Sequence, residues 1–298
     1  MQELDEVRAI VREAAIRTPL VAFEDYWLKL ENLQPLGSFK IRGAYYAVKS
    51  LPPEEKSRGV WTASAGNMGQ GLAYAARQSG VPCTVVVPET APKTKLDAML
   101  RLGAKLVRLP FVEWWRVVET RVHPDVSGTF IHPCDDDRMI AGNSTIGAEI
   151  MEDLPDVDAV VVPWGGGGLA CGISRTVRAT VWAVEVATAA PLAASMEAGE
   201  PIVVQRTPSF VDGIGGTGVF PRMFEMAKSR IAGPIVVELD EVRAALRDLA
   251  LHGRIVAEGA GAASVAAART GKAGKGKIVC VISGGNIDAR VLSDILAP

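Results

Sequence analysis

Residues 30–48 read LENLQPLGSFKIRGAYYAV, and the remaining motifs of the chain acquire a meaning around the lysine in this stretch, Lys40. Next to it, apolar residues recur at the spacing of an amphipathic helix: Phe39, Ile41, Ala44, Tyr45 and Val48. We therefore expect the Lys40 amine in a partly apolar place, where desolvation lowers the pKa of a lysine and favours the neutral, nucleophilic amine. Taken alone, the pattern is more typical of an exposed lysine on an amphipathic helix, so other motifs have to decide.

Length and composition favour a small-molecule protein. With 298 residues, 48% of them apolar, the chain can bury a large core and favours two domains over one. The 32 basic and 34 acidic residues nearly cancel and form no basic block, which argues against nucleic acid or a membrane as partner. The four cysteines are far apart and lack metal-ligand spacing, which indicates reduced thiols.

A glycine run, Gly165 to Gly168, follows a β-branched strand pattern and opens a helical one. Backbone amides without side chains at a helix N-terminus form an anion site, so this run predicts a phosphate cradle. The same residues also fit a dinucleotide fingerprint, with Glu185 twenty residues beyond Gly165 as the ribose-binding acid. An NAD-binding Rossmann protein is therefore an alternative, but it assigns no role to Lys40.

Five motifs in order decide between these readings: GSFKIRGA (37–44), SAGNMGQG (64–71), VPWGGGGLACGI (162–173), EGAGAASVAA (258–267) and SGGN (283–286). Together they resemble the pyridoxal-phosphate enzymes of fold type II, most closely the serine/threonine dehydratase and serine racemase branch, over nearly the whole chain. The resemblance implies pyridoxal 5'-phosphate as cofactor and a two-domain α/β fold like that of tryptophan synthase β. In that fold, parallel-rich open sheets carry helices on both faces.

The order of secondary structure agrees with such a fold, because short β-type runs alternate with helical patterns. In a first series we expect strands at 60–63, 83–87, 105–109 and 129–132. In a second series we expect strands at 159–162, 181–186, 235–239 and 277–282, helices at 139–154, 169–179 and 262–269, and one more helix after an N-cap at Asp240. By resemblance, residues 1–53 and 139–298 form the large cofactor-binding domain and residues 54–138 an inserted small domain.

The resemblance also assigns roles to residues. Lys40 would hold the cofactor as a Schiff base and, once released, take the α-proton of the substrate. Asn67 would bind the phenolic oxygen of the cofactor, Ser283 its pyridine nitrogen and Phe39 its ring. Its phosphate would lie on Gly165, Gly166, Gly167, Gly168 and Leu169. The loop formed by Ser64, Ala65, Gly66 and Asn67 precedes a helix and can hold the substrate carboxylate.

These groups imply β-elimination from a β-hydroxy amino acid, such as L-threonine or L-serine, to a 2-keto acid and ammonia. A hydroxyl at Ser283 cannot keep the pyridine nitrogen protonated as a carboxylate would, which favours elimination over long-lived carbanion chemistry. Racemases resemble one another in a second serine where this chain has Ala65, so racemisation is the weaker alternative. A β-replacement synthase of the same fold is another.

Other departures and polar residues remain without an assigned catalytic role. Met68 and Cys134 stand where the dehydratases usually have His and often Asn, and could reshape the substrate pocket. Glu185 aligns with one cation ligand of the racemases, but Pro191 falls at the second, so no metal is expected. The run 135–137 is expected to be a solvated loop start before a helix. His123, His132 and His252 are expected to be structural.

Location and assembly are expectations from the same sources. The N-terminus, MQELDEVRAIVREAA, lacks the basic and apolar regions of a signal peptide, so we expect the protein in the cytoplasm. The chain ends soon after Asn286, and feedback control through an allosteric C-terminal domain is not expected. The resemblance implies a homodimer or a higher homo-oligomer and an amino acid as the small-molecule partner.

Overall fold

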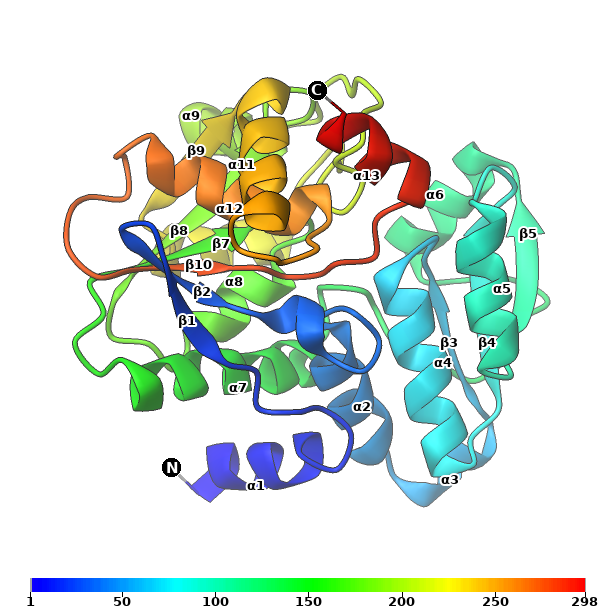
Figure 1. Ribbon diagram of the computed structural model, residues 1–298. Helices are drawn as coiled ribbons and strands as arrows, with labels where there is room; N and C mark the ends of the chain where they lie inside the picture. Colours follow the sequence, from blue (N-terminus) through cyan, green and yellow to red (C-terminus); the bar gives the residue numbers. More distant parts are fainter. Residues whose placement is uncertain (1, 298) are drawn as a thin grey trace. The chain divides into compact units, whose positions relative to one another are not determined.

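The computed structural model describes residues 2–297. Contacts divide the chain into two compact units, the first formed by Met1–Ile16 with Lys40–Thr145 and the second by Arg17–Phe39 with Ile146–Pro298. Each unit has its own β-sheet with helices on both faces (Figure 1). The expected α/β fold with parallel-rich sheets is therefore confirmed.

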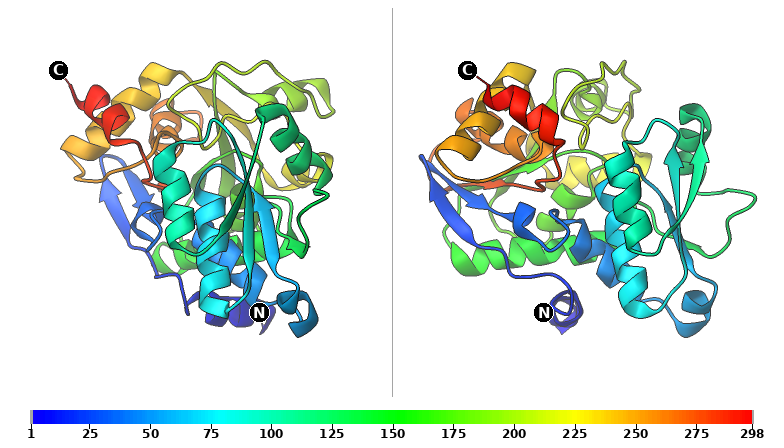
Figure 2. Two further views of the ribbon diagram at one scale, coloured as in Figure 1. Left: turned by 90° about the vertical axis from the view of Figure 1, so that its right-hand side faces the viewer. Right: turned by 45° about the vertical axis from the view of Figure 1, so that its right-hand side comes forward.

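The first unit contains a four-stranded sheet in which every pairing is parallel. Its strand order is β5 (Lys105–Leu109), β4 (Cys83–Pro88), β3 (Val60–Ala63) and β6 (Thr129–Phe130). Helices α4 (Asn67–Ser79) and α5 (Lys93–Arg101) lie on one face and α6 (Phe111–Thr120) on the other (Figure 2). Strand β3 is buried at all its residues, as expected for a parallel strand that is covered on both sides.

The remaining helices of this unit are α1 (Gln2–Val11), α2 (Lys40–Lys49), α3 (Pro53–Ser57) and the first part of α7 (Asp137–Asp153). Helix α2 packs closely on α4, and Gly71 of α4 makes this approach possible. A Cβ atom at Gly71 would lie 3.2 Å from the Lys40 carbonyl oxygen and 3.3 Å from the Ala44 Cβ. Met68 and Leu72 of α4 fill the core below this contact.

The second unit contains a six-stranded sheet, parallel except for the hairpin of its first two strands. Its order is β1 (Leu20–Phe23), β2 (Tyr26–Lys29), β10 (Ile278–Val281), β7 (Ala159–Pro163), β8 (Thr180–Val186) and β9 (Gly233–Val237). Helix α12 (Gly259–Arg269), with α11 (Leu239–Leu251) outside it, covers one face, and α8 (Gly168–Ile173) covers the other (Figure 1). The small residues of α12 allow a close approach, since a Cβ at Gly261 would lie 3.0 Å from the Gly284 carbonyl oxygen.

The expected strands are present, but several helix boundaries differ. Helix α8 ends at Ile173 instead of continuing to residue 179. The N-cap of α11 is Glu238, not Asp240, because Glu238 and Glu241 form a reciprocal capping box. Four of the described helices were not expected from the sequence: α3 (Pro53–Ser57), α9 (Pro191–Ala198), α10 (Pro221–Arg230) and α13 (Ala289–Leu296). Three of these begin with a proline, which is compatible with the first position of a helix.

The contact-based units and the expected domains use different boundaries. Residues 1–16, 40–53 and 139–145 group by contacts with the unit of the four-stranded sheet, whereas the sequence placed them in the large domain. The division into residues 1–53 with 139–298, and 54–138, stays a prediction.

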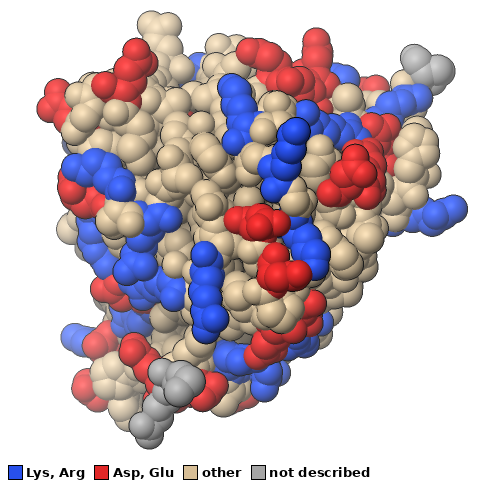
Figure 3. Space-filling model, turned by 90° about the vertical axis from the view of Figure 1, so that its left-hand side faces the viewer, with Lys and Arg blue, Asp and Glu red and all other residues tan. Residues whose placement is uncertain are grey.

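The surface carries charges of both signs. Figure 3 shows basic and acidic side chains interspersed on one face, in agreement with a formal net charge of −2. Among residues 2–297, no helix has both the length and the apolar character that crossing a bilayer requires.

Candidate active site

Lys40 is the first residue of α2 and is half-buried. Its Nζ donates a hydrogen bond to the Pro133 carbonyl oxygen at 2.6 Å. Its backbone is held by close helix contacts, because Gly71 approaches the Lys40 carbonyl and a Cβ at Gly142 of α7 would lie 2.6 Å from the Arg42 carbonyl oxygen. The structure thus places the amine of Lys40 at a helix start whose position is fixed by packing.

The turn beside Lys40, residues 132–135, is buried and polar. The His132 side chain is 1% exposed, and its Nδ1 accepts hydrogen bonds from the amides of Cys134 (3.2 Å) and Asp135 (2.8 Å). Burial, together with the positive charge of Arg121, lowers the pKa of the imidazole to about 4. The Cys134 Sγ lies 3.5 Å from the same Nδ1, and burial raises the pKa of this thiol to about 12. Both side chains are therefore neutral at physiological pH.

The expectation of a solvated acidic run is wrong for two of the three aspartates. Asp135 is 6% exposed and forms an ion pair with Arg121. Asp136 accepts hydrogen bonds from the Arg138 and Met139 amides, so it caps the start of α7. Only Asp137 is exposed. A run of three acids conceals such differences, because Asp135 pairs with Arg121 of an earlier segment whereas Asp136 binds the residues that directly follow the run.

The loop of Ser64, Ala65, Gly66 and Asn67 connects β3 to α4, as expected, and all four residues are half-buried. The Ser64 Oγ accepts a hydrogen bond from the Gly66 amide at 3.2 Å, and Asn67 is already the first residue of the helix. The Ala65 methyl packs against the apolar cluster formed with β4 and α5.

Met68, next in the sequence, is 2% exposed and points into the core of the first unit. It therefore acts as a packing residue.

The glycine run of the second unit lies at the carboxyl end of β7. The amides of Gly165, Gly166 and Gly167 make no hydrogen bond to another described residue, so three consecutive donors are available to an anion. Gly167 has φ +88°, and a Cβ there would lie 2.5 Å from Trp164 Cη2. The run therefore suits a phosphate group. A residue with a side chain at position 167 would both clash with Trp164 and strain the left-handed backbone.

Ser283 and Phe39 lie next to each other in the second unit. Ser283 is 2% exposed at the end of β10, and its carbonyl oxygen accepts a hydrogen bond from the Phe39 amide at 3.0 Å. Further along, the Gly285 amide donates to Gly37 O at 2.8 Å and Asn286 Nδ2 to Leu36 O at 2.8 Å. The SGGN loop thus holds the segment that directly precedes Lys40 in the sequence.

Glu258 is a residue to which the sequence assigned no role. It is 7% exposed and precedes α12, and its amide donates to Gly284 O at 2.9 Å. A Cβ at Gly284 would lie 2.6 Å from Glu258 Oε1, and one at Gly213 would lie 3.6 Å from the same atom. A buried carboxylate thus faces the glycines beside Ser283. The sequence signal was an acid directly before a run of small residues, EGAGAAS.

The structure gives Glu185 a structural role. Its side chain is fully buried, and its carboxylate oxygens accept hydrogen bonds from the Leu192 and Ala193 amides, both at 2.8 Å. Burial raises the pKa of this carboxyl to about 7, although the two amides act in the opposite direction. Glu185 therefore caps α9, and its carboxylate is not available for a ribose as the NAD alternative requires. Among the described residues, no group of three or more His, Cys, Asp or Glu side chains could hold a metal.

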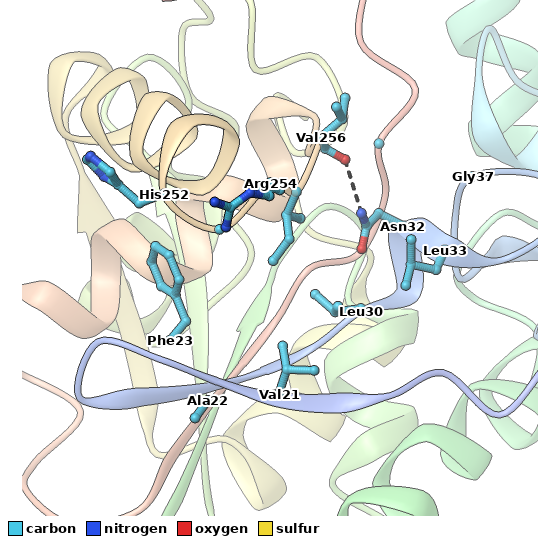
Figure 4. Close-up of a pocket in the computed structure, with 13 residues that line it drawn as sticks. Val21, Ala22, Phe23, Leu30, Asn32, Leu33, Gly37, His252, Arg254 and Val256 are labelled. Carbon is cyan, nitrogen blue, oxygen red and sulfur yellow. Dashed lines mark hydrogen bonds between the residues drawn. The ribbon is translucent and has the colours of Figure 1, made fainter.

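The second unit has a cavity of about 710 Å³ between the β1–β2 hairpin and residues 252–256. Figure 4 shows the residues that line it. Most of its lining is apolar, and Asn32 Nδ2 donates to Val256 O across one end at 3.0 Å. The lining includes Gly37 and Gly285 but none of the expected site residues. This cavity is therefore distinct from the candidate site.

Comparison with known proteins assigns the class. Residues 11–284 match the family of pyridoxal-phosphate dependent enzymes, and the chain belongs to this family. The L-threonine ammonia-lyase of Thermotoga maritima is 38% identical over 99% of this chain and 78% of its own length.

Two solved structures are also similar. The threonine deaminase isoform 2 of Solanum lycopersicum, in its processed form, has a TM-score of 0.88 and 32% identity, covering 99% of this chain and 91% of its own. The serine racemase of maize has a TM-score of 0.91 and 27% identity, covering 98% and 95%. The family and its cofactor expected from the motifs are confirmed.

Proposed function

We propose that this protein is a pyridoxal-phosphate dependent ammonia-lyase that converts L-threonine or L-serine to a 2-keto acid and ammonia. The observation that carries the proposal is the 38% identity to an L-threonine ammonia-lyase over 99% of the chain. The geometry supports it, because a half-buried lysine starts a fixed helix and three consecutive glycine amides are available to a phosphate. The cofactor supplies an electron sink for the pair left at the substrate α-carbon.

The individual roles are part of the proposal. Lys40 attaches the cofactor covalently and, when released, removes the substrate α-proton at its Nζ. Gly165, Gly166, Gly167 and Gly168, with Leu169, hold the phosphate through backbone amides.

With the cofactor bound, Ser283 would face the pyridine nitrogen, Phe39 would pack on the ring and Asn67 would bind the phenolic oxygen. Ser64, Ala65 and Gly66, with Asn67, bind the substrate carboxylate at the start of α4.

Elimination is favoured over racemisation by a feature of this loop. The methyl group of Ala65 packs against an apolar cluster and can neither give nor accept a proton. A second proton-transfer group opposite Lys40, which racemisation needs, is therefore not supplied by this position.

The test is spectroscopic and chemical. We expect the purified protein to absorb in the visible range, to lose this absorbance on borohydride reduction, and to carry the reduced cofactor on the peptide containing Lys40. A screen of β-hydroxy amino acids should then show keto-acid and ammonia release with L-threonine or L-serine. A colourless protein that no cofactor reconstitutes, or a coloured one that releases no keto acid from any of them, would refute the proposal.

Assembly and location stay predictions. We propose a homodimer or higher homo-oligomer in the cytoplasm; size-exclusion chromatography with light scattering tests the first part and cell fractionation the second.

A further inference from the structure

The turn at residues 132–135 has a feature that packing alone does not require. His132 Nδ1 accepts two hydrogen bonds from main-chain amides, so the proton of the neutral imidazole is on Nε2. Because burial lowers the pKa of this imidazole to about 4, Nδ1 remains an acceptor at all physiological pH values. The imidazole therefore fixes the orientation of the peptide between Pro133 and Cys134.

The same peptide contacts Lys40. The N–H of Cys134 points to His132, and in a planar trans peptide the carbonyl of Pro133 must point the opposite way. On that side, the Pro133 oxygen accepts the hydrogen bond from Lys40 Nζ at 2.6 Å, which is at the short end of the usual range. One imidazole thus determines where the acceptor for the lysine amine lies.

The far end of the turn is also fixed. Asp135 is buried and paired with Arg121, which is the left-handed C-cap of α6 at φ +61°. The Cys134 thiol, whose pKa is raised to about 12, adds no charge to the turn. The negative charge of Asp135 is balanced by Arg121, and the Pro133 carbonyl is an acceptor that the turn offers to an ammonium at Lys40.

We propose that His132 is a positioning residue, which aims the Pro133 carbonyl at Lys40 Nζ so that it receives the ammonium formed when Lys40 takes the substrate α-proton. This inference rests on the proposed function. In the step, the α-carbon–hydrogen bond breaks, its electron pair stays on the substrate, and the proton forms a new N–H bond on Lys40. One N–H of the ammonium donates to Pro133, and another can later protonate the leaving hydroxide to give water.

The test compares two substitutions of His132. His132→Phe keeps a ring but removes the acceptor, whereas His132→Asn keeps an acceptor that can bond the amide two residues on. For His132→Phe we expect kcat for L-threonine to fall about 10- to 100-fold, within the range for a misplaced acid–base group, while KM changes less than about 3-fold. The primary isotope effect with α-deuterated L-threonine should increase. His132→Asn should recover most of kcat.

A second readout does not depend on turnover. In cofactor-stripped full-length protein, the pH dependence of covalent capture of added pyridoxal phosphate reports the ionisation of Lys40. Removing the acceptor of the ammonium favours the neutral amine, so the midpoint should move to lower pH in His132→Phe and stay in place in His132→Asn.

His123→Phe is the matched control. His123 Nδ1 accepts the Asp125 amide at 3.1 Å, which is the same arrangement at another turn of the first unit. This variant should leave kcat and the midpoint unchanged.

The outcomes separate the two proposals. A wild-type protein without lyase activity or a cofactor on Lys40 defeats the proposed function itself. An active wild type with an unchanged kcat and midpoint in His132→Phe overturns the positioning role alone. If His132→Phe does not fold, His132→Leu, which also lacks the acceptor, takes its place: an unchanged kcat and midpoint in the folded variant overturn the role, whereas a loss that His132→Asn recovers supports it.

Discussion

The residues that we propose as functional are of a different kind in each of the two units. In the second unit the relevant groups are main-chain atoms, with the amides of Gly165, Gly166 and Gly167 and the loop at Ser283 held by backbone hydrogen bonds. In the first unit they are side chains, with Lys40 beside the turn that His132 orients. Binding by main-chain amides is disturbed by substitutions that add side-chain atoms. Chemistry performed by side chains is disturbed by removing the side chain or by changing its protonation.

The largest effect is expected at Lys40. Lys40→Ala should remove the visible absorbance and lower keto-acid release by at least about 10³-fold, because one amine acts as both anchor and base. The fold should remain, since the Lys40 side chain is half-buried and does not belong to the apolar cluster in which α2 packs. Absorbance, product release and circular dichroism measure the three properties.

Lys93→Ala is the control for that change, because Lys93 is exposed on α5 and pairs with Asp97. It should retain full activity. A yellow, active Lys40→Ala protein would place the cofactor anchor elsewhere.

The main-chain side of the comparison is tested by adding one methyl group. Gly167→Ala introduces a Cβ 2.5 Å from Trp164 at φ +88°, so it combines backbone strain with a clash against a fully buried ring. We expect the free energy of unfolding to fall by about 2–4 kcal/mol and cofactor affinity to fall at least about 10-fold. Denaturant unfolding and cofactor titration provide the two measurements.

Gly199→Ala separates strain from clash. Gly199 has φ +80° but nothing within 4 Å of its would-be Cβ, so this variant should lose only about 1 kcal/mol and bind the cofactor normally. Equal losses in the two variants would show that the close approach to Trp164 does not matter.

Glu185 of the second unit has a shifted pKa that we expect to affect the stability of the protein and not its catalysis. Burial raises the pKa of its carboxyl to about 7, above its ordinary value, so the folded state binds more protons than the unfolded state between about pH 4.5 and 7. Stability from this group is therefore present at low pH and is lost as the pH rises through about 7. Compared with Glu185→Gln, the wild type should have a larger stability advantage at pH 5 than at pH 8, by on the order of 1–3 kcal/mol.

Urea unfolding at the two pH values measures this difference. Glu197→Gln, at an exposed position of α9, the helix whose first amides bind Glu185, should show no such pH dependence. If the relative stability of Glu185→Gln does not vary with pH, the carboxyl titrates normally.

Local patterns were sufficient to predict the strand and helix that flank the glycine run. The strand before Gly165 and the run of glycines are adjacent in the sequence, so β7 and the loop that follows it could be predicted together, while the phosphate-binding role of the loop stays a prediction. The side-chain partners could not, because Lys40 and Pro133 are 93 positions apart and their contact depends on how α2 and the turn pack. The burial of Asp135 and of Met68 could not be predicted either, because it also depends on tertiary packing. Asp135 pairs with Arg121, and Met68 belongs to an apolar cluster that includes Ile131.

The smallest effect is expected at Ala65 of the first unit, whose methyl group cannot transfer a proton. Ala65→Ser places a hydroxyl where the racemases carry one, so the ratio of D-serine to pyruvate formed from L-serine should rise a few-fold. The increase is limited because position 65 packs against apolar side chains, which offer the new hydroxyl no hydrogen bond to hold it in a single rotamer. Only part of the molecules would then have the hydroxyl turned toward the loop. Chiral analysis of remaining serine, with solvent deuterium incorporation, gives the ratio. Ala73→Ser adds a hydroxyl to the same apolar cluster away from the loop and should leave the ratio unchanged. If wild type already forms D-serine as fast as pyruvate, Ala65 does not limit racemisation and the proton on that face comes from another group.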